Sequence, residues 1–379
     1  AVNHTENMTF KASVKPIKSL RIDLSADRNL MENRTSNLGI GDNNSFALLN
    51  NQFNGSFSTS TISWKTAFSQ DIMNDTTLSN QIWENLLSYR SEISSIMSQS
   101  NPNASNNLEN TGYYSGYDST QQDVIIGAFI CAYLGDSPTL NNINPLSQRI
   151  PLPNWRVTFD GLGKIKAFKK YIKKLSFTHA YRSNFSLGNY TTNLNGQWDN
   201  EGNATETDIS GNFISQKQIM TMNILEQFAP LLGVDLTLSN NMSVKFEIKK
   251  DRNISLSLSN NQITEIKGSE IKFGSGYTWR KLSLPIKIAG KTLDPSDLRM
   301  RLDIAVRDNK TIIRKIVENQ NQYTAGQTAV TIQFSGDYNL TKQLMLRIYF
   351  DRRVNTPHVS NSFPTANTNA GFALRFQLR

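Results

Sequence analysis

Apolar and polar residues alternate along most of the chain, a period of two that indicates β-strands with one apolar and one polar face. In the clearest example, the segment 175–187, Phe177, Tyr181 and Phe185 share one parity, whereas Thr178 and Arg182 share the other. A strand of about thirteen residues spans roughly 44 Å, or about 30 Å when it is tilted near 45°. This span matches the hydrocarbon core of a bilayer, so the segment is predicted to cross a membrane.

The same alternation predicts about fifteen strands, nearly all joined to their sequence neighbours as up-and-down hairpins. Within this series, Asp308-Asn309-Lys310 predicts a tight hairpin turn between strands at 299–307 and 311–318. Separate strands are also predicted at 242–249 and 253–261.

The region between residues 75 and 135 departs from the alternation and predicts two helices. Asp75 is the candidate N-cap of the first helix. The second starts with a capping-box pattern at 119–122 and ends before Gly135. The predicted organisation is therefore barrel strands at 1–74, a helical insertion at 75–150 and barrel strands at 151–379.

Alternation alone also fits a β-sandwich, but strand length and the grouping of aromatic residues near strand ends favour a membrane barrel. We predict an all-β fold, a large antiparallel transmembrane β-barrel in which this chain supplies part of a bigger wall. The candidate lumen-facing residues lie on the polar parity: Arg182, Arg299, Arg301, Asp303, Arg307, Arg347, Asp351 and Arg375. The candidate lipid-facing or girdle residues lie on the apolar parity: Trp155, Phe159, Phe177, Tyr181, Phe185, Tyr277, Trp279, Phe350, Phe372 and Phe376.

Composition agrees with strands rather than helices as the membrane-crossing elements. Hydrophobic residues make up 38% of the chain, mean hydropathy is −0.44, and no apolar run reaches the length of a membrane helix. The net charge of +9 is mostly dispersed through the strand patterns, with one basic cluster at 164–174. Since no nucleic-acid-binding module accompanies it, no nucleic-acid partner is predicted.

The sequence contains no recognisable catalytic set. Its single cysteine, Cys131, lies in an apolar run, and its histidines, His4, His179 and His358, are far apart. A zinc site of usual composition is therefore not predicted, and neither a phosphate-binding glycine loop nor a nucleophile elbow is present. We predict no enzymatic activity, no metal and no cofactor.

Five segments carry a resemblance that goes beyond periodicity. They are LPNWRVTFDGL (152–162), KKLSFTHAYRSNFSLGNYTTNLN (173–195), EQFAPLLGVDLTLSNNMSVKFEIKKDRNISLSLSNNQ (226–262), RLDIAVRDNKTIIRKI (301–316) and SNSFPTANTNAGFALRFQLR (360–379). Together, in this order, they resemble the C-terminal part of the SprA/Sov family. That family supplies the outer-membrane translocon of the type IX secretion system in Bacteroidetes.

The resemblance implies a protein-conducting channel in the cell outer membrane that exports folded cargo and, in gliding species, adhesins. The partners that it implies are the rest of the translocon polypeptide, a PorV-type cargo-shuttle barrel protein, a periplasmic plug protein, cargo with a C-terminal signal domain, and the lipid bilayer. Two alternatives remain open: a self-contained porin or transporter barrel, and a secreted β-sandwich adhesin.

Counting strands back from a periplasmic C-terminus gives an expected sidedness. It places the turn at 15–19 and the helical insertion on the periplasmic side. It places the basic connection at 164–174 on the opposite side.

Overall fold

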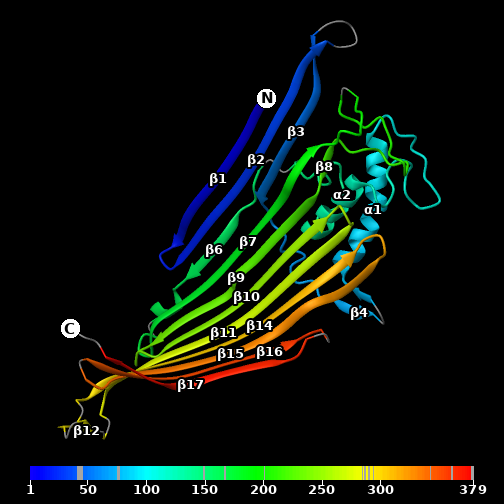
Figure 1. Cartoon of the computed structure of the whole chain (residues 1–379). Coiled ribbons are helices and arrows are strands. Elements are labelled where there is room, and N and C mark those ends of the chain that lie inside the picture. The colour runs from blue at the N-terminus through cyan, green and yellow to red at the C-terminus, as the bar shows by residue number, and fades with distance from the viewer. Residues whose placement is uncertain are drawn as a thin grey trace.

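The protein is built around one 13-stranded antiparallel sheet (Figure 1), which confirms the predicted all-β antiparallel fold. The computed structural model describes residues 1–40, 46–74, 77–147, 150–165, 168–199, 201–283, 285, 287–288, 291–292, 294–341, 343–359 and 362–376. The strands of the sheet are β1 (Val2–Ile17), β2 (Leu20–Ile40), β3 (Phe46–Ser60), β6 (Asn154–Phe159), β7 (Ile172–Thr192), β8 (Lys217–Ile219), β9 (Thr221–Leu238), β10 (Ser243–Ser257), β11 (Gln262–Leu282), β14 (Ser296–Lys315), β15 (Gln320–Asn339), β16 (Leu344–Pro357) and β17 (Thr365–Phe376).

Several smaller elements lie outside this sheet. They are the strand pair β4 (Ile72–Asn74) and β5 (Thr77–Ser79), the pair β12 (Lys287–Ile288) and β13 (Lys291–Thr292), the helices α1 (Gln81–Ser100) and α2 (Gln122–Leu134), and the short 3-10 helix η1 (Leu162–Lys164). None of the described helices is long and apolar enough to cross a bilayer.

The sheet is open. In the described part of the chain, β1 pairs only with β2 and β17 pairs only with β16, so these two strands form free edges. The path between them follows chain order, β1-β2-β3-β7-β9-β10-β11-β14-β15-β16-β17. The chain thus forms one wall with two unpaired borders.

The strands are longer than predicted, because several predicted pairs are single strands. The tripeptide Asp308-Asn309-Lys310 lies inside the 20-residue β14, so the hairpin predicted there is wrong. The segments 242–249 and 253–261 likewise belong to one strand, β10, except for their ends. In both cases charged residues interrupt the apolar parity in mid-strand.

The helices belong to an insertion that interrupts a single strand position of the sheet. Both β3 and β6 lie between β2 and β7, end to end. The chain leaves the sheet after Ser60 and returns at Asn154. A backbone hydrogen bond from Leu152 N to Ser60 O (3.0 Å) joins the two break points, and one from Thr61 N to Ser183 O (3.2 Å) ties the first of them to β7.

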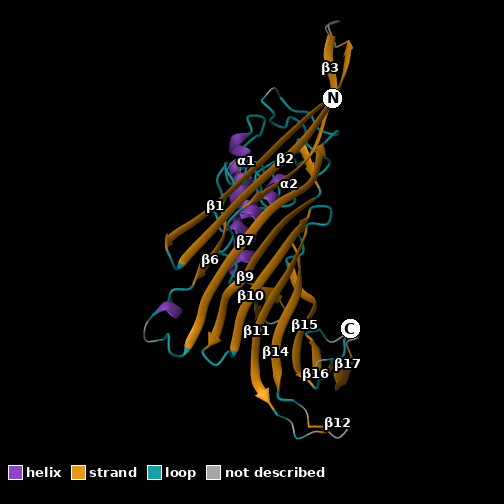
Figure 2. Ribbon diagram, turned by 90° about the vertical axis from the view of Figure 1, so that its left-hand side faces the viewer, coloured by secondary structure: helices purple, strands orange, loops and turns teal. Residues whose placement is uncertain are grey.

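Both helices lie against one face of the sheet (Figure 2). Helix α2 is buried from Val124 to Leu134, which explains its uniformly apolar sequence and the placement of Cys131. The predicted C-terminal residue Gly135 adopts the left-handed conformation (φ 80°) that favours glycine. Helix α1 is capped by Asn80, whose side chain accepts from Trp83 N; the predicted cap, Asp75, lies outside the described residues.

The two ends of the sheet differ, and the expected sidedness is partly wrong. The β1–β2 turn and the β6–β7 connection lie at the same end, where Asp160 N donates to Ser19 O (2.9 Å). The C-terminal end of β17 lies there as well, whereas the helices lie near the other end (Figure 1). The basic connection is therefore on the side of the 15–19 turn, and the insertion is opposite. We call these the turn end and the helix end.

Candidate functional site: a two-faced wall

Strand register places all eight candidate lumen-facing residues on one face of the sheet, which we call the polar face. Residues paired directly across an antiparallel ladder project to the same side. Through this register Arg299 pairs with Asp337, which pairs with Arg347, and Asp303 pairs with Gln333, which pairs with Asp351. The full set on this face is Arg182, Arg299, Arg301, Asp303, Arg307, Arg347, Asp351 and Arg375.

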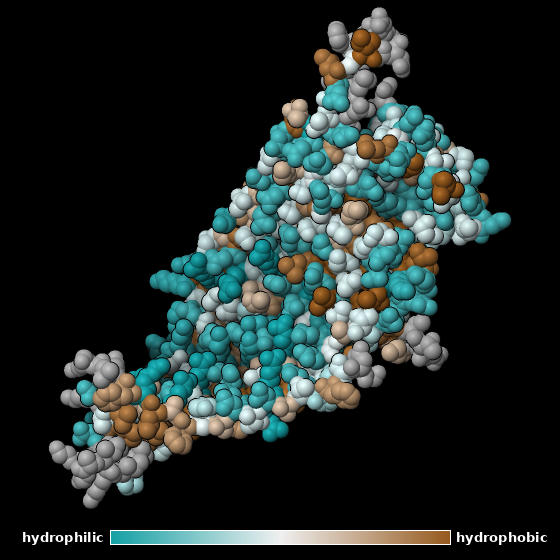
Figure 3. All heavy atoms as spheres, viewed as in Figure 1, coloured by the Kyte–Doolittle hydropathy of each residue, from teal (hydrophilic) through white to brown (hydrophobic). Residues whose placement is uncertain are grey.

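The polar face is hydrophilic over most of its extent. In the orientation of Figure 1 the helices lie behind the sheet, and Figure 3 shows hydrophilic side chains predominating on the face turned to the viewer. Neighbouring charges along one strand pair with each other, as in Arg301 Nε with Asp303 Oδ2 (2.5 Å) and Lys245 Nζ with Glu247 Oε1 (3.1 Å). Such exposed pairs contribute little to stability but keep the surface wet.

The opposite face carries a continuous apolar band in its turn-end half. In β11 the band runs from Ile271 to Trp279 and in β14 from Leu298 to Val306, nine residues in each strand. A tilted membrane-crossing strand needs about 9–11 residues. Across the sheet the band contains Phe10, Ala12, Val14, Leu20, Ile22, Leu24, Trp155, Val157, Phe159, Leu175, Phe177, Leu232, Val234, Leu236, Val244, Phe246, Ile248, Ile271, Phe273, Tyr277, Trp279, Leu298, Met300, Leu302, Ile304, Val306, Val330, Ile332, Phe334, Leu346, Ile348, Phe350, Phe372, Leu374 and Phe376.

No part of the described chain covers much of this band. Trp279 is 52% exposed and Phe372 is 76% exposed, although both belong to an ordered sheet. A contiguous exposed apolar surface of this kind marks contact with a membrane or another protein. Together with the charged opposite face, it gives the wall the two-sided architecture of an outer-membrane β-barrel.

The band crosses the ladder obliquely, as expected if the strands are tilted relative to a bilayer. One ladder row joins Trp155, Tyr181, Phe228, Lys250, Ser269 and Asp308. In β6 the residue of this row, Trp155, belongs to the apolar band. In β10 and β14 the residues of the same row are the charged Lys250 and Asp308, which lie beyond the band. Strand tilts of about 35–45° in membrane barrels produce this drift.

Eight of the ten candidate lipid-facing residues lie in the band, but two have different surroundings. Tyr181 and Phe185 share its parity, yet both are buried beneath the insertion. The Tyr181 ring stacks on Trp155 (4.5 Å between centroids) and contacts Phe228 (4.9 Å). Their expected contact with lipid is therefore wrong, because the insertion covers β7 on the helix-end side of the band. His179 packs nearby and contacts Leu231 O through Nδ1 (2.7 Å).

Two buried ionic clusters fasten the insertion to the sheet. In the first, Glu226 Oε2 lies 2.9 Å from Arg252 Nη2, and Glu226 Oε1 accepts from Ser63 Oγ (2.7 Å) and Tyr181 OH (2.8 Å). Arg252 also donates to Thr66 O (3.0 Å) and Thr66 Oγ1 (2.8 Å). Ser63 and Thr66 of the insertion thus bind the Glu226–Arg252 pair of the sheet directly.

The second cluster centres on Arg314 of β14. Its Nη2 lies 2.6 Å from Asp71 Oδ1 and 3.0 Å from Glu265 Oε2, and its guanidinium lies 5.8 Å from the Trp83 ring. Lys267 Nζ contacts Asp71 Oδ2 (2.6 Å) and Glu265 Oε1 (3.3 Å). Burial opposes ionisation of Asp71, but Lys267 and Arg314 outweigh it and hold the pKa of this carboxyl below its usual value.

These charged residues were missed by sequence reasoning, although a signal was available. Glu226, Arg252, Glu265 and Arg314 all lie on the apolar parity of their strands. A full charge on that parity marks the position along the strand where the apolar band ends and the insertion begins to cover the same face. Of these four residues, Arg252 lies in the false break predicted within β10, whereas the false turn in β14 came from Asp308-Asn309-Lys310.

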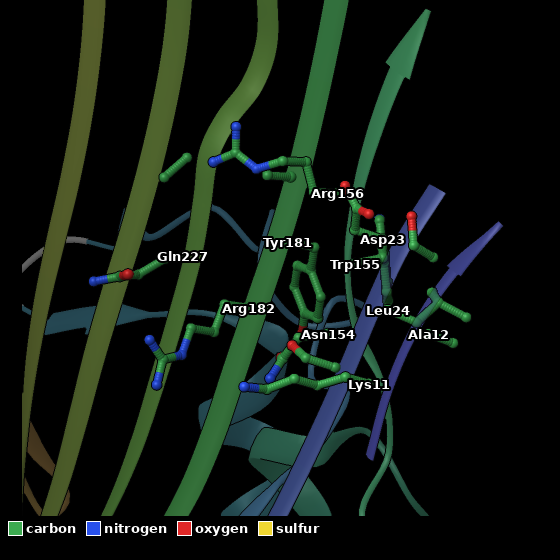
Figure 4. A pocket seen from close by; sticks show the side chains of 14 residues that line it. Lys11, Ala12, Asp23, Leu24, Asn154, Trp155, Arg156, Tyr181, Arg182 and Gln227 are labelled. Carbon is green, nitrogen blue, oxygen red and sulfur yellow. The ribbon is translucent and has the colours of Figure 1, made fainter. Parts of the chain in front are cut away.

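The polar face also contains a hollow of about 650 Å³ near the interrupted strand position. Figure 4 shows Lys11, Arg156 and Arg182 extending from strands β1, β6 and β7 into this region, with Asp23 and Gln227 beside them. The hollow is therefore cation-rich and open to solvent. In the described residues no group of three or more His, Cys, Asp or Glu side chains could hold a metal ion.

Comparison with known proteins gives little further information. No family model matches the chain, and no curated protein matches it. Among solved structures, the chain aligns with OmpT (in-vitro folded), an outer membrane protein of Vibrio cholerae in its trimer form. The alignment covers 99% of this chain and 96% of that one at 9% identity, but its TM-score of 0.22 is too low to support an argument.

Proposed function

We propose that this chain is part of the wall of a protein-conducting outer-membrane β-barrel, the translocon of a type IX secretion system. The observation that carries the membrane part of the proposal is the apolar band, nine residues tall in β11 and β14, opposite a charged face. The translocon part rests on the resemblance to the SprA/Sov family in the five segments quoted above. In this proposal the apolar band contacts lipid in the cell outer membrane and the polar face lines the conduit.

The open sheet favours a segment of a larger wall over the self-contained porin or transporter. The free edges at β1 and β17 would pair with strands from the rest of the translocon polypeptide, since unpaired edges of this length invite pairing. The β-sandwich alternative has no support, because in the described chain no second large sheet faces the 13-stranded one.

The wall acts passively in this proposal: it carries no reaction and requires no cofactor. Cargo with a C-terminal signal domain, including adhesins in gliding species, would pass along the polar face. Export would also involve a PorV-type cargo-shuttle barrel protein and a periplasmic plug protein. Charged, hydrated side chains suit this surface because they bind a passing folded protein weakly.

Neighbouring residues on opposite faces provide the test. The full-length protein is produced in cells with either Arg301→Cys or Leu302→Cys, together with cargo that has one exposed cysteine. A bifunctional maleimide added during export then joins the two thiols through thioether bonds. The 301 position is expected to crosslink to cargo during export, whereas the 302 position is expected to remain uncrosslinked. Equal crosslinking at both positions, or none at 301 while cargo is exported, would overturn the proposal.

A further inference from the structure

A segment of the insertion crosses the sheet along the helix-end border of the apolar band. This segment, residues 62–73, is called the strap. The Trp64 ring contacts Trp155 of β6 edge-on (6.3 Å between centroids), and the Phe68 ring contacts Phe228 of β9 (5.4 Å). Further along, Asp71 forms its ion pair with Lys267 of β11. The strap therefore runs across the strands, from β6 to β11.

The strap lies at the level where apolar side chains give way to charged ones. Toward the turn end, the next side chain on this face after Lys250 is Ile248, after Ser269 it is Ile271, and after Asp308 it is Val306. The residues that follow belong to the apolar band. If the band spans the hydrocarbon core, the strap lies in the headgroup region of one leaflet.

The strap exposes large side chains suited to that region. Trp64 is 53% exposed, Met73 is 61% exposed, and Phe68 and Ile72 are also exposed. Aromatic side chains gather at membrane–water interfaces, because the ring is apolar while its face attracts cations. Lys250 uses that property: its Nζ lies 4.2 Å from the centre of the Phe68 ring.

Beside the strap is a basic hollow of about 320 Å³. Lys250, Lys267 and Lys310 line it, together with Asp71, Asp308 and Tyr323. Lys267 is committed to Asp71 and Glu265, and Lys310 lies 3.4 Å from Asp308. Lys250 forms no ion pair with any carboxylate in the described part of the chain, so its charge is available to an external anion.

We propose that the strap and this hollow form a site for the phosphate group of an anionic membrane lipid. Lys250 and Lys310 would contact the phosphate, Trp64 and Phe68 would lie among the headgroups, and the acyl chains would continue over Ile248 and Val306. A lipid satisfies both halves of the site, whereas a free phosphate would use only the lysines. This inference rests on the proposed membrane location of the apolar band.

The test uses the intact protein in nanodiscs, with an environment-sensitive fluorophore on Met73→Cys. The native Cys131 is buried, and burial raises the pKa of its thiol to about 12, so it competes little for the label. Raising the phosphatidylglycerol fraction in phosphatidylcholine nanodiscs is expected to shift the fluorescence saturably. Lys250→Gln or Lys310→Gln should raise the half-saturating fraction about five-fold.

The matched control is Lys249→Gln, because Lys249 is the next residue but lies on the polar face beside Glu247. It should leave the half-saturating fraction unchanged. An equal effect of Lys249→Gln, no effect of the Lys250 and Lys310 variants, or an equal shift on adding inorganic phosphate to phosphatidylcholine nanodiscs would overturn the lipid site.

A second label separates this inference from the proposed function. A fluorophore on Ile304→Cys, in the apolar band, should be quenched by lipids brominated in their acyl chains. Loss of that quenching would refute the membrane location itself. Quenching at 304 without a Lys250 or Lys310 effect would refute only the lipid site.

Discussion

Two adjacent residues of one strand project to opposite faces of the sheet and therefore meet different surroundings. Ile304 is part of the apolar band, whereas its neighbour Ala305 lies on the polar face. Between them the environment changes from exposed apolar surface to a charged, wet surface within one residue.

That contrast leads to the first prediction. Ile304→Lys should destabilise the membrane-inserted wall by about 2–4 kcal/mol, because it places a charge against hydrocarbon near the bilayer midplane. Ala305→Lys should change stability by only about 0.5 kcal/mol. The fraction of heat-modifiable, folded protein in membranes along a denaturant series measures both. Similar losses for the two variants would contradict the assignment of faces.

The buried charges obey a different rule. Arg314 is fully buried with Glu265, and removing one partner of a buried pair leaves the other charge uncompensated. Arg314→Met should therefore weaken attachment of the insertion by about 3–5 kcal/mol.

Hydrogen exchange of the α2 amides in the intact protein measures this loss of attachment free energy. The exchange rate should increase on the order of 100-fold or more. Arg307→Met, on the polar face of the same strand, should leave exchange nearly unchanged. Unaltered exchange in Arg314→Met would show that the apolar core alone holds the insertion.

At the scale of elements, the attachment of the insertion to the sheet should depend on pH. The pKa of Asp71 lies below its usual value in the folded protein, because Lys267 and Arg314 outweigh the effect of burial. When the strap is detached, this carboxyl should titrate near its ordinary value of about 3.9. The detached state then binds more protons, so the stabilisation is complete above about pH 5 and decreases as the pH falls through the depressed pKa.

Cleavage of the insertion by an acid-active protease should consequently increase between about pH 4 and pH 2. Asp71→Asn should remove most of this dependence, since the amide does not titrate. Asp123→Asn, at the first turn of α2, serves as the control for a carboxylate elsewhere in the insertion. An unchanged pH profile in Asp71→Asn would eliminate the strap carboxylate as the responsible group.

For the whole molecule, the open edges are the feature with the clearest consequence. If β1 is paired with another strand of a larger barrel, its outward amides are hydrogen-bonded. They should then exchange at least about 100-fold more slowly than solvent-exposed amides in the intact protein. Hydrogen exchange followed by mass spectrometry of the Val2–Ile17 peptide measures this. Rapid exchange would identify β1 as a true border and contradict the extended wall.

The sequence by itself determined the strand fold and the division of side chains between faces. A period of two assigns each residue to a side without reference to its neighbours, so Arg182, Arg301 and Arg375 separate correctly from Phe177 and Phe372. It also identified α2, because a wholly apolar run of that length ending at glycine suits a buried helix.

Only the tertiary structure decided what covers each part of the apolar parity. Parity is a local property of one strand, whereas burial depends on which distant segment lies above it. Tyr181 and Phe177 are equivalent in sequence, but the insertion covers the first and leaves the second in the band. For the same reason the mid-strand charges at Arg252 and Asp308 resembled turn signals, since the cluster and strap that lie at their level come from far along the chain.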